Sequence, residues 1–336
     1  MHNFWKKLKK PIIALAPMAG YTDSAFRQIC REFGADVVYS EMISVDGICY
    51  DNQKTMRMLW HDKSEYPLVF QLFGNDPIKF KKAVRIITGS LRSLELGRDR
   101  LLLGLDINFG CPAHKVIKTG SGASLMDEKE KAYHIIKAVC DNTDLPVSIK
   151  IRTKVKNTTA EEFINRVKDL SWTTVMIHGR TLNQGFSGEI DYVAIRKIKK
   201  LLPDKIVLAN GGITDNQSAI RLLKKTGADG LGIASGALGN PWIFSQIKSP
   251  PLAKREMPPI LHLGQRGSIM LRHAELFFKN NNNLIPFRQH LVHYVKSQKN
   301  ASELRQKLIK VKTLAELNKI ILEISSLLPS ATTTIR

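Results

Sequence analysis

The chain has 336 residues, of which 43% are hydrophobic and 24% are charged. This length and composition exclude a largely disordered chain and favour one barrel-sized domain with a smaller second domain. Lys and Arg number 51 against 30 Asp and Glu, so the formal net charge is +21. Such an excess favours polyanionic partners, nucleic acid first and an anionic membrane surface second.

The four cysteines are too few for a disulfide framework, and their spacing matches no metal motif. We therefore expect a reducing, cytoplasmic compartment and no metal site. No apolar run approaches the length of a membrane span. Pro17 interrupts the short apolar stretch behind the basic N-terminus, so no signal peptide is expected. No feature points to an obligate protein partner.

Eight short, mostly apolar runs are predicted to be strands, and helical patterns lie between them. The runs are Ile12–Met18, Asp36–Met42, Leu68–Phe73, Leu103–Phe109, Val147–Arg152, Thr174–His178, Ile206–Asn210 and Gly230–Ala234. The helical patterns include Ile78–Leu91, Phe163–Leu170 behind a capping box at Thr159–Glu162, Tyr192–Leu202 and Asn216–Lys225. Near-continuous apolar runs are typical of parallel strands covered on both faces.

Eightfold alternation of strand and helix predicts an α/β fold, a (β/α)8 TIM barrel. An open doubly wound sheet is the alternative, but no G-x-G-x-x-G sequence follows the first run. Glycines instead follow the ends of several runs, as at Gly20, Gly74, Gly110 and Gly179. In a barrel those ends form the face that binds ligands.

The pattern becomes all-helical behind two Pro-Pro pairs, which mark a linker. The predicted domains are a barrel at residues 1–248, a linker at 249–259 and a helical domain at 260–336. The predicted helices of the helical domain are Ile260–Lys279, Pro286–Val295, Ser302–Lys310 and Thr313–Leu328, the last with a capping box at Thr313–Glu316. Residues 250–336 hold 14 Lys and Arg against 5 Asp and Glu, a net charge of +9. This domain is either a solubilised helical cap or a surface that docks a polyanion.

Three polar side chains lie at the ends of predicted strands, namely Gln71, Lys150 and His178. A buried amine or imidazole needs a partner, and three such groups on one face indicate a ligand site, although a lone His is as often a core residue. The loops Asn210-Gly211-Gly212 and Ala234-Ser235 follow the seventh and eighth runs, where barrels commonly bind phosphate. They are either two tight turns or the phosphate site of a cofactor.

The fourth run ends in Asp106-Ile-Asn108-Phe-Gly-Cys111-Pro112, which places an amide and a thiol at the same face. A buried cysteine is usually an inert small hydrophobe. This thiol lies in a loop stiffened by Pro112, and a thiol that is mostly protonated at neutral pH can act as a general acid as well as a nucleophile. No Asp and His pair indicates a hydrolase triad.

Several fragments together resemble the tRNA-dihydrouridine synthase family, in that family's order and spacing. They are Ala16–Arg27 (APMAGYTDSAFR), Asp106–Lys115 (DINFGCPAHK), Lys150-Ile-Arg152, His178-Gly-Arg180, Asn210-Gly-Gly212 and Pro241-Trp-Ile-Phe244. Phe287–Leu291, Ala301–Arg305 and Lys312–Leu317 are similar to the bacterial B-type branch. The resemblance covers roughly residues 11–325.

The resemblance implies FMN-dependent reduction of the uracil 5,6 double bond in tRNA, with NADPH reducing the flavin. Cys111 would be the proton donor. The other implied positions are Pro17, Met18 and Ala19 against the flavin ring, Gln71 and Lys150 at its polar edge, His178 beside flavin or substrate, Asn210, Gly211, Gly212, Ala234 and Ser235 at the phosphate, and Asn108, Arg152 and Arg180 near the uracil or its backbone.

The chain departs from the family pattern where Ala234-Ser235 stands in place of Gly-Arg, Asn240 in place of Arg and Gly212 in place of Asp. The phosphate loses a cationic partner, so FMN binds more weakly or another Lys or Arg assists. Two alternatives remain open, a flavin-dependent barrel acting on a free small molecule and an RNA-binding protein with an inactive barrel.

Overall fold

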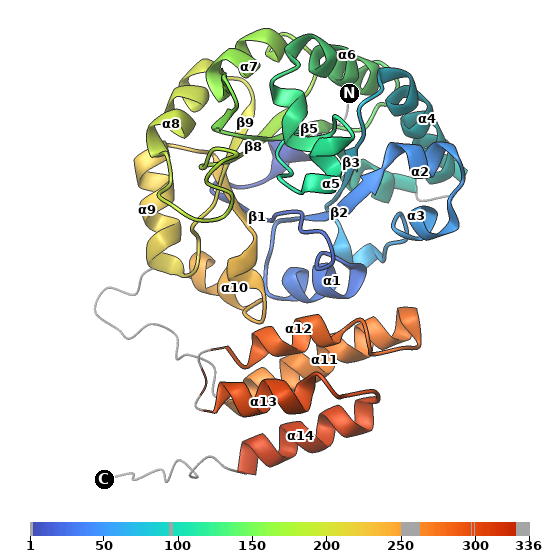
Figure 1. Cartoon of the computed structure of the whole chain (residues 1–336), viewed down its shortest axis with the longest axis vertical. Helices are drawn as coiled ribbons and strands as arrows, with labels where there is room; N and C mark the ends of the chain where they lie inside the picture. Colours follow the sequence, from blue (N-terminus) through green and yellow to red (C-terminus); the bar gives the residue numbers. More distant parts are fainter. Residues whose placement is uncertain (1–2, 94–96, 250–262, 297, 299, 327–336) are drawn as a thin grey trace. The chain divides into compact units, whose positions relative to one another are not determined.

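The computed structural model describes residues 3–93, 97–249, 263–296, 298 and 300–326. The chain forms two compact units (Figure 1). The first, called the barrel unit, comprises Met1–Gly236 and Ile243–Ile247. The second, called the helical unit, comprises Ala237–Trp242 and Lys248–Arg336. Among the described residues, no helix is both long and apolar enough to cross a membrane.

Eight parallel strands close into a barrel in the order β1-β10-β9-β8-β5-β4-β3-β2 (Figure 1). They are β1 (Ile12–Leu15), β2 (Val37–Ser44), β3 (Leu68–Phe73), β4 (Leu103–Asn108), β5 (Val147–Arg152), β8 (Thr174–His178), β9 (Ile206–Asn210) and β10 (Gly230–Ile233). A hairpin of β6 (Lys154–Val155) and β7 (Thr158–Thr159) follows β5. The closed parallel sheet confirms the predicted TIM barrel and excludes the open doubly wound sheet.

Four strands, β3, β5, β8 and β9, have the predicted bounds, and the others differ at their ends. β1 ends at Leu15, three residues before the predicted end at Met18. Pro17 has no N–H to pair with a neighbouring strand, and Met18 is hydrogen-bonded within the turn that follows. In that turn Thr22 Oγ1 accepts a hydrogen bond from Met18 N and donates to Met18 O, both at 3.1 Å. β2 extends to Ser44 through an irregularity between Tyr39 and Met42.

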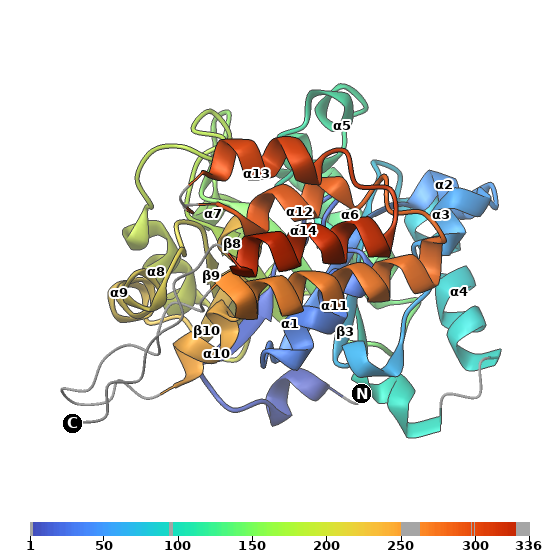
Figure 2. The same ribbon diagram turned by 90° about the horizontal axis from the view of Figure 1, so that it is seen from below.

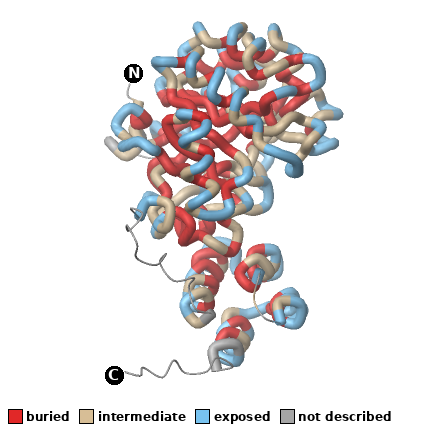
Figure 3. The backbone as a smooth tube through the Cα atoms, turned by 90° about the vertical axis from the view of Figure 1, so that its left-hand side faces the viewer, coloured by how far each residue is buried: buried red, intermediate tan, exposed pale blue. Residues whose placement is uncertain are grey.

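Helices surround the strands, and the burial pattern places the core in the strand layer (Figure 3). They are α1 (Ser24–Glu32), α2 (Val45–Cys49), α3 (Gln53–Arg57), α4 (Pro77–Ser93), α5 (His114–Lys118), α6 (Lys129–Cys140), α7 (Ala160–Val167), α8 (Tyr192–Leu201), α9 (Asn216–Thr226) and α10 (Ile243–Lys248). The capping box before α7 is confirmed, since Thr159 and Glu162 exchange hydrogen bonds at 2.8 and 3.3 Å. α7 ends at Val167 and not at the predicted Leu170.

The amino end of the barrel is closed by the first residues of the chain. The short 3-10 helix η1 (Phe4–Lys7) buries Phe4 and Trp5 against the starts of several strands, including Ile12 and Val37. The ring centroids of Trp5 and Tyr39 lie 6.3 Å apart. With this end filled by aromatic side chains, the carboxyl end is left for a ligand.

The helical unit contains α11 (Leu263–Asn281), α12 (Arg288–Tyr294), α13 (Ala301–Leu308) and α14 (Leu314–Ser326), drawn in orange and red in Figure 2. These confirm the predicted helical C-terminal region, with ends shifted by a few residues. In the predicted capping box, Glu316 N donates to Thr313 Oγ1 at 3.2 Å, while the Glu316 carboxylate accepts from Lys312 N and not from Thr313 N.

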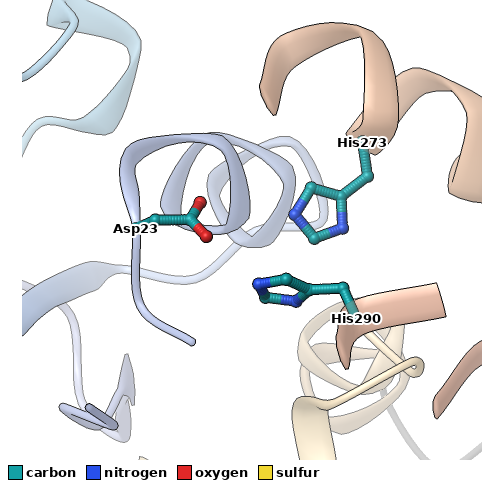
Figure 4. Close-up of side chains that lie close together, drawn as sticks. All are labelled: Asp23, His273 and His290. Atoms are coloured by element: carbon teal, nitrogen blue, oxygen red, sulfur yellow. The ribbon is translucent and has the colours of Figure 1, made fainter. Parts of the chain in front are cut away.

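Aromatic and imidazole rings pack together in the helical unit. The rings of His273 and His290 are both buried, and their centroids lie 4.7 Å apart in an edge-to-face arrangement (Figure 4). His273 Nδ1 lies 3.0 Å from Tyr294 Oη, and its ring meets Phe287 edge to face at 4.6 Å. These contacts join α11 to α12 and its flanking residues.

The segment Ala237–Trp242 packs with the helical unit. Gly239 has a φ of +63°, and a Cβ there would lie 2.2 Å from the carbonyl carbon of His293, so only glycine permits this approach. The ring of Trp242 lies 6.5 Å from that of Tyr294. The predicted linker, residues 249–259, falls outside the described residues except for Ser249, and the predicted domain boundaries stay a prediction.

Candidate active site

The strand register brings the predicted polar residues together at the carboxyl end of the barrel. Neighbouring strands pair Gln71 with Asp106, Asn108 with Lys150, Arg152 with His178 and His178 with Asn210. These pairs continue from β3 through β4, β5 and β8 to β9, so the side chains form one arc of the rim. Residues as far as 139 positions apart in the sequence, Gln71 and Asn210, thereby share one face.

The loop that carries Cys111 is held through its backbone. Asn108 Oδ1 accepts hydrogen bonds from Gly110 N at 3.1 Å and from Cys111 N at 2.9 Å. Ala123 N donates to Cys111 O at 3.1 Å. The Cys111 residue itself remains partly exposed and is not part of a disulfide. Cys111 is therefore a partly exposed residue on a loop whose backbone is held by hydrogen bonds at both its N–H and its carbonyl.

Lys150 brings a cation to the same place. Its ammonium group makes no hydrogen bond or ion pair with any residue that the structure describes. Burial first, and the charge of Arg152 second, lower the pKa of Lys150 to about 8, against the opposing effects of Asp106 and an ionised Cys111. The loop that carries Cys111 passes beside both residues, since a Cβ on Gly110 would lie 3.5 Å from Lys150 O and 3.7 Å from Arg152 Cγ.

Arg152 is almost completely buried, and its guanidinium group donates hydrogen bonds to three backbone oxygens. Its Nε donates to Gly110 O at 2.8 Å, and its Nη1 donates to Thr181 O at 3.0 Å and to Gly185 O at 2.8 Å. It thus joins the thiol loop to the loop after β8. Burial, with a smaller effect of Arg180, lowers the pKa of Arg152 to about 10, so it stays charged at neutral pH.

His178 is a neutral side chain in this site. Burial first, then the charges of Lys150, Arg152 and Arg180, lower the pKa of His178 to about 2. Arg180 Nη1 lies 3.4 Å from His178 Nε2, and because a guanidinium only donates, this nitrogen accepts. Arg180 Nε also donates to Gly188 O at 2.9 Å. His178 is therefore uncharged at neutral pH and does not act there as a general acid.

The loops after β9 and β10 present backbone amides. Gly211 and Gly212 have φ values of +111° and +67°, and neither amide makes a hydrogen bond within the described part of the chain. Asn210 Nδ2 is used internally, since it donates to Gly232 O at 2.7 Å. Ala234 is partly exposed, and the side chain of Ser235 is exposed at the start of η5 (Ser235–Ala237). The amides of this rim are the groups suited to an anion.

The segment after β1 lies at the same carboxyl end as the other loops. Pro17 and Met18 are partly buried and Ala19 is exposed. Met18 is held by both the backbone and the hydroxyl of Thr22. Gly20 N donates to the carboxylate of Glu41, which ties this segment to β2.

Sequence reasoning missed three groups at the site. Asp106 is buried, and its carboxylate accepts from Gln71 Nε2 at 2.6 Å and from Ser148 Oγ at 2.5 Å. A charged residue inside the apolar run of β4 was the signal that could have found it. Met42 Sδ lies 3.1 Å from Asn108 Nδ2, and the exposed ring of Phe186 lies 5.8 Å from the Arg152 guanidinium and 6.3 Å from the His178 ring. Neither has a recognisable signal in the sequence.

A scan against family models matches residues 14–329 to the dihydrouridine synthase (Dus) family. The chain is 34% identical over 298 residues to tRNA-dihydrouridine synthase B of Pseudomonas aeruginosa, covering 87% of this chain and 86% of that protein. It is 33% identical over 312 residues to a probable tRNA-dihydrouridine synthase of Helicobacter pylori strain J99, covering 92% and 89%. The chain therefore belongs to the dihydrouridine synthase family, whose members are flavin-dependent oxidoreductases.

Two solved structures share the fold at low sequence identity. Histamine dehydrogenase from Rhizobium sp. 4-9 aligns with a TM-score of 0.52 at 12% identity, over 79% of this chain and 49% of that one. A 2-naphthoyl-CoA reductase complex aligns with a TM-score of 0.50 at 9% identity, over 70% and 49%. The chain thus spans about half the length of each, and these likenesses support the barrel fold alone.

Proposed function

We propose that this protein reduces the 5,6 double bond of specific uridines in tRNA to dihydrouridine, with FMN as the flavin and NADPH as its reductant. The observation that carries the proposal is the rim that unites the Cys111 thiol, the partnerless ammonium group of Lys150 and the amides after β9. Family membership supports the tRNA substrate and the flavin. The choice of NADPH and the cytoplasmic location stay predictions from the sequence.

The donor set of the rim fits FMN. The amides of Gly211 and Gly212 suit the phosphate, and the ammonium group of Lys150 suits the ring edge that becomes negative on reduction. Pro17, Met18 and Ala19 would pack against the ring. Gln71 is fully buried and already bonded to Asp106 and Asn108, which leaves one hydrogen of its Nε2 for the flavin.

The proposed general acid is Cys111. When bound, the reduced flavin supplies a hydride to C6 of the uracil, and the product needs a proton at C5. The partly exposed thiol of Cys111 can donate that proton. The cations of Lys150 and Arg152 nearby stabilise the thiolate that remains.

The uracil has to leave its base stack to react, because a stacked base cannot present its 5,6 double bond to a flavin held at the end of the barrel. Arg180 and the Nη2 edge of Arg152 are the charged donors proposed to meet it. Asn108 acts mainly through the thiol loop, since both hydrogens of its Nδ2 contact Gln71 Oε1 and Met42 Sδ. The exposed basic residues of the helical unit, among them Lys310 and Lys312, are proposed to bind tRNA phosphates.

The test compares Cys111→Ala with Cys49→Ala, which removes a partly buried thiol on α2 outside the rim. Purified protein is expected to be yellow, and both variants should keep the flavin. Multiple-turnover reduction of tRNA that lacks dihydrouridine should fall about 10²-fold or more in Cys111→Ala and stay at the normal rate in Cys49→Ala. Nucleoside mass spectrometry measures the product. Full turnover by Cys111→Ala would rule out the proposed acid.

A further inference from the structure

A connected set of polar side chains lies inside the barrel beneath the rim and ends at the thiol loop. It starts at the buried carboxylate of Asp106 on β4. Asp106 accepts from Ser148 Oγ and from Gln71 Nε2 at 2.5 and 2.6 Å, and Gln71 Oε1 accepts from Asn108 Nδ2 at 2.8 Å. Asn108 Oδ1 then accepts the amides of Gly110 and Cys111. All members lie within the barrel unit.

The direction of these hydrogen bonds is set at both ends. An ionised carboxylate only accepts, so Gln71 has to turn its amino group toward Asp106 and its oxygen toward Asn108. Asn108 then has to turn its amino group toward Gln71, which leaves its oxygen for the thiol loop. The backbone amides of Gly110 and Cys111 only donate, so the reverse orientation of either side-chain amide would leave buried groups without partners.

We propose that Asp106 is a positioning residue, whose carboxylate orients the amides of Gln71 and Asn108 and, through Asn108, holds the backbone that carries the Cys111 thiol. The inference rests on the proposed function only for the role of the thiol as an acid. The loop has further supports, Arg152 Nε at Gly110 O and Ala123 N at Cys111 O, so loss of Asp106 loosens the loop without releasing it.

Two substitutions of the same residue separate this role from simple stabilisation of the core. In Asp106→Asn, the new amide can turn its oxygen to Gln71 Nε2 and its amino group to Ser148 Oγ, which can redirect its own hydrogen to Leu105 O, 3.3 Å away. The order of donors and acceptors is then kept. Asp106→Val leaves Gln71 Nε2 without its acceptor, so the orientation of the Gln71 and Asn108 amides is fixed only from the loop end, by the Gly110 and Cys111 amides.

The measurement is amide hydrogen exchange of the full-length protein without added cofactor, followed in a peptide that contains Gly110 and Cys111. We expect exchange in this peptide to be at least tenfold faster in Asp106→Val and within twofold of the wild type in Asp106→Asn. A peptide covering β9 serves as the internal reference, because general destabilisation would accelerate it equally. Gln71→Met removes the amide that links Asp106 to Asn108 and should reproduce the Asp106→Val pattern if that variant does not fold.

Turnover with tRNA gives the second readout. Asp106→Val should lower kcat at least tenfold with the KM for tRNA unchanged, and Asp106→Asn should keep most of kcat. The inference is overturned if Asp106→Val and Gln71→Met leave the thiol-loop peptide as protected as the wild type, or if Asp106→Asn loses as much as Asp106→Val. Failure of the wild type to reduce tRNA would instead overturn the proposed function, and the exchange data would still decide the role of Asp106.

Discussion

Lys150 lies near the carboxyl end of β5 beside other cations, and this environment lowers the pKa of its amine. Burial and the neighbouring Arg152 lower the pKa of Lys150 to about 8, so it stays mostly charged at pH 7 and loses that charge in mildly alkaline solution. A cation placed this way stabilises a ligand whose negative charge increases on reduction. Its side chain is free for such a ligand because no described residue bonds to it.

We predict that Lys150→Met lowers the midpoint potential of the bound flavin by about 30 to 60 mV, which corresponds to losing one charge-assisted hydrogen bond in a two-electron couple. Methionine keeps the length and most of the volume but removes the charge. Reductive titration followed by flavin absorbance measures the shift. In the wild type the potential should also fall as the pH rises through about 8. An unchanged potential in the variant would show that Lys150 does not face the ring.

The free energy of unfolding should depend on pH through the buried carboxyl group of Asp106. Burial raises the pKa of Asp106 to about 6, although hydrogen bonds from Ser148 and Gln71 oppose the shift. The unfolded value is about 3.9. Between these pH values the folded state holds a proton that the unfolded state has released, so the free energy of unfolding falls as pH rises, by up to roughly 3 kcal/mol, and is level above pH 6.

Asp106→Asn should remove this dependence. Denaturant unfolding of both proteins from pH 4 to pH 7 measures it, and the stability of the wild type relative to the variant should decrease over that range. A relative stability that increases with pH would mean that the carboxylate is better stabilised in the folded protein than in water, contrary to its buried position.

Among the elements, the turn after β9 combines an unusual backbone with a crowded position. Gly211 has a φ of +111°, and a Cβ there would lie 2.8 Å from His178 Cδ2 and 2.9 Å from Ile190 Cδ1. Gly227, behind α9, also has a positive φ of +67° but nothing within 4 Å of the Cβ position. A side chain at either glycine would therefore be strained by the positive φ, but only a side chain at Gly211 would also press against a residue of the site, His178.

We predict that Gly211→Ala lowers FMN affinity at least tenfold, because the turn has to shift the amides proposed to bind the phosphate. Gly227→Ala should cost about 1 to 2 kcal/mol of stability through backbone strain and leave FMN affinity unchanged. Equilibrium binding of FMN, measured by quenching of its fluorescence, compares the two variants. Equal affinity in both would place the phosphate elsewhere.

Charge is distributed unevenly along the chain. Residues 250–336 carry +9 of the total +21 in about a quarter of the length. The exposed basic residues of the helical unit include Lys310, Lys312 and Lys319. A small-molecule enzyme gains nothing from such a surface, whereas binding of tRNA phosphates by lysines releases counterions and depends strongly on salt.

We predict that the triple variant Lys310→Glu, Lys312→Glu and Lys319→Glu raises the KM for tRNA at least tenfold at physiological salt, with kcat at saturating tRNA unchanged. The slope of log binding constant against log salt should decrease in magnitude by about 2 to 3. The matched control reverses three exposed lysines of the barrel unit, Lys81, Lys82 and Lys200. Equal effects of both triple variants would indicate a general effect of net charge and no docking surface.

The order of the elements and the face that carries the site were predictable from the amino-acid sequence. Apolar runs with the period of buried parallel strands predicted eight strands, and four of them have the predicted bounds. Because parallel strands of a barrel all end at one rim, Gln71, Lys150 and His178 were predicted to converge from their positions at strand ends alone. The capping box of Thr159 and Glu162 was also predictable, because it is a local hydrogen-bond pattern.

The hydrogen-bond partners of the polar side chains at that rim became known only from the folded structure. Gln71 bonds to Asp106 across 35 positions, and Arg152 bonds to Gly110 across 42, so no local pattern shows that these groups are partly engaged inside the protein. The neutral state of His178 likewise comes from burial beside cations of other loops. Hydrogen-bond partners and desolvation depend on which distant residues share a small volume, and that is a property of the packed barrel.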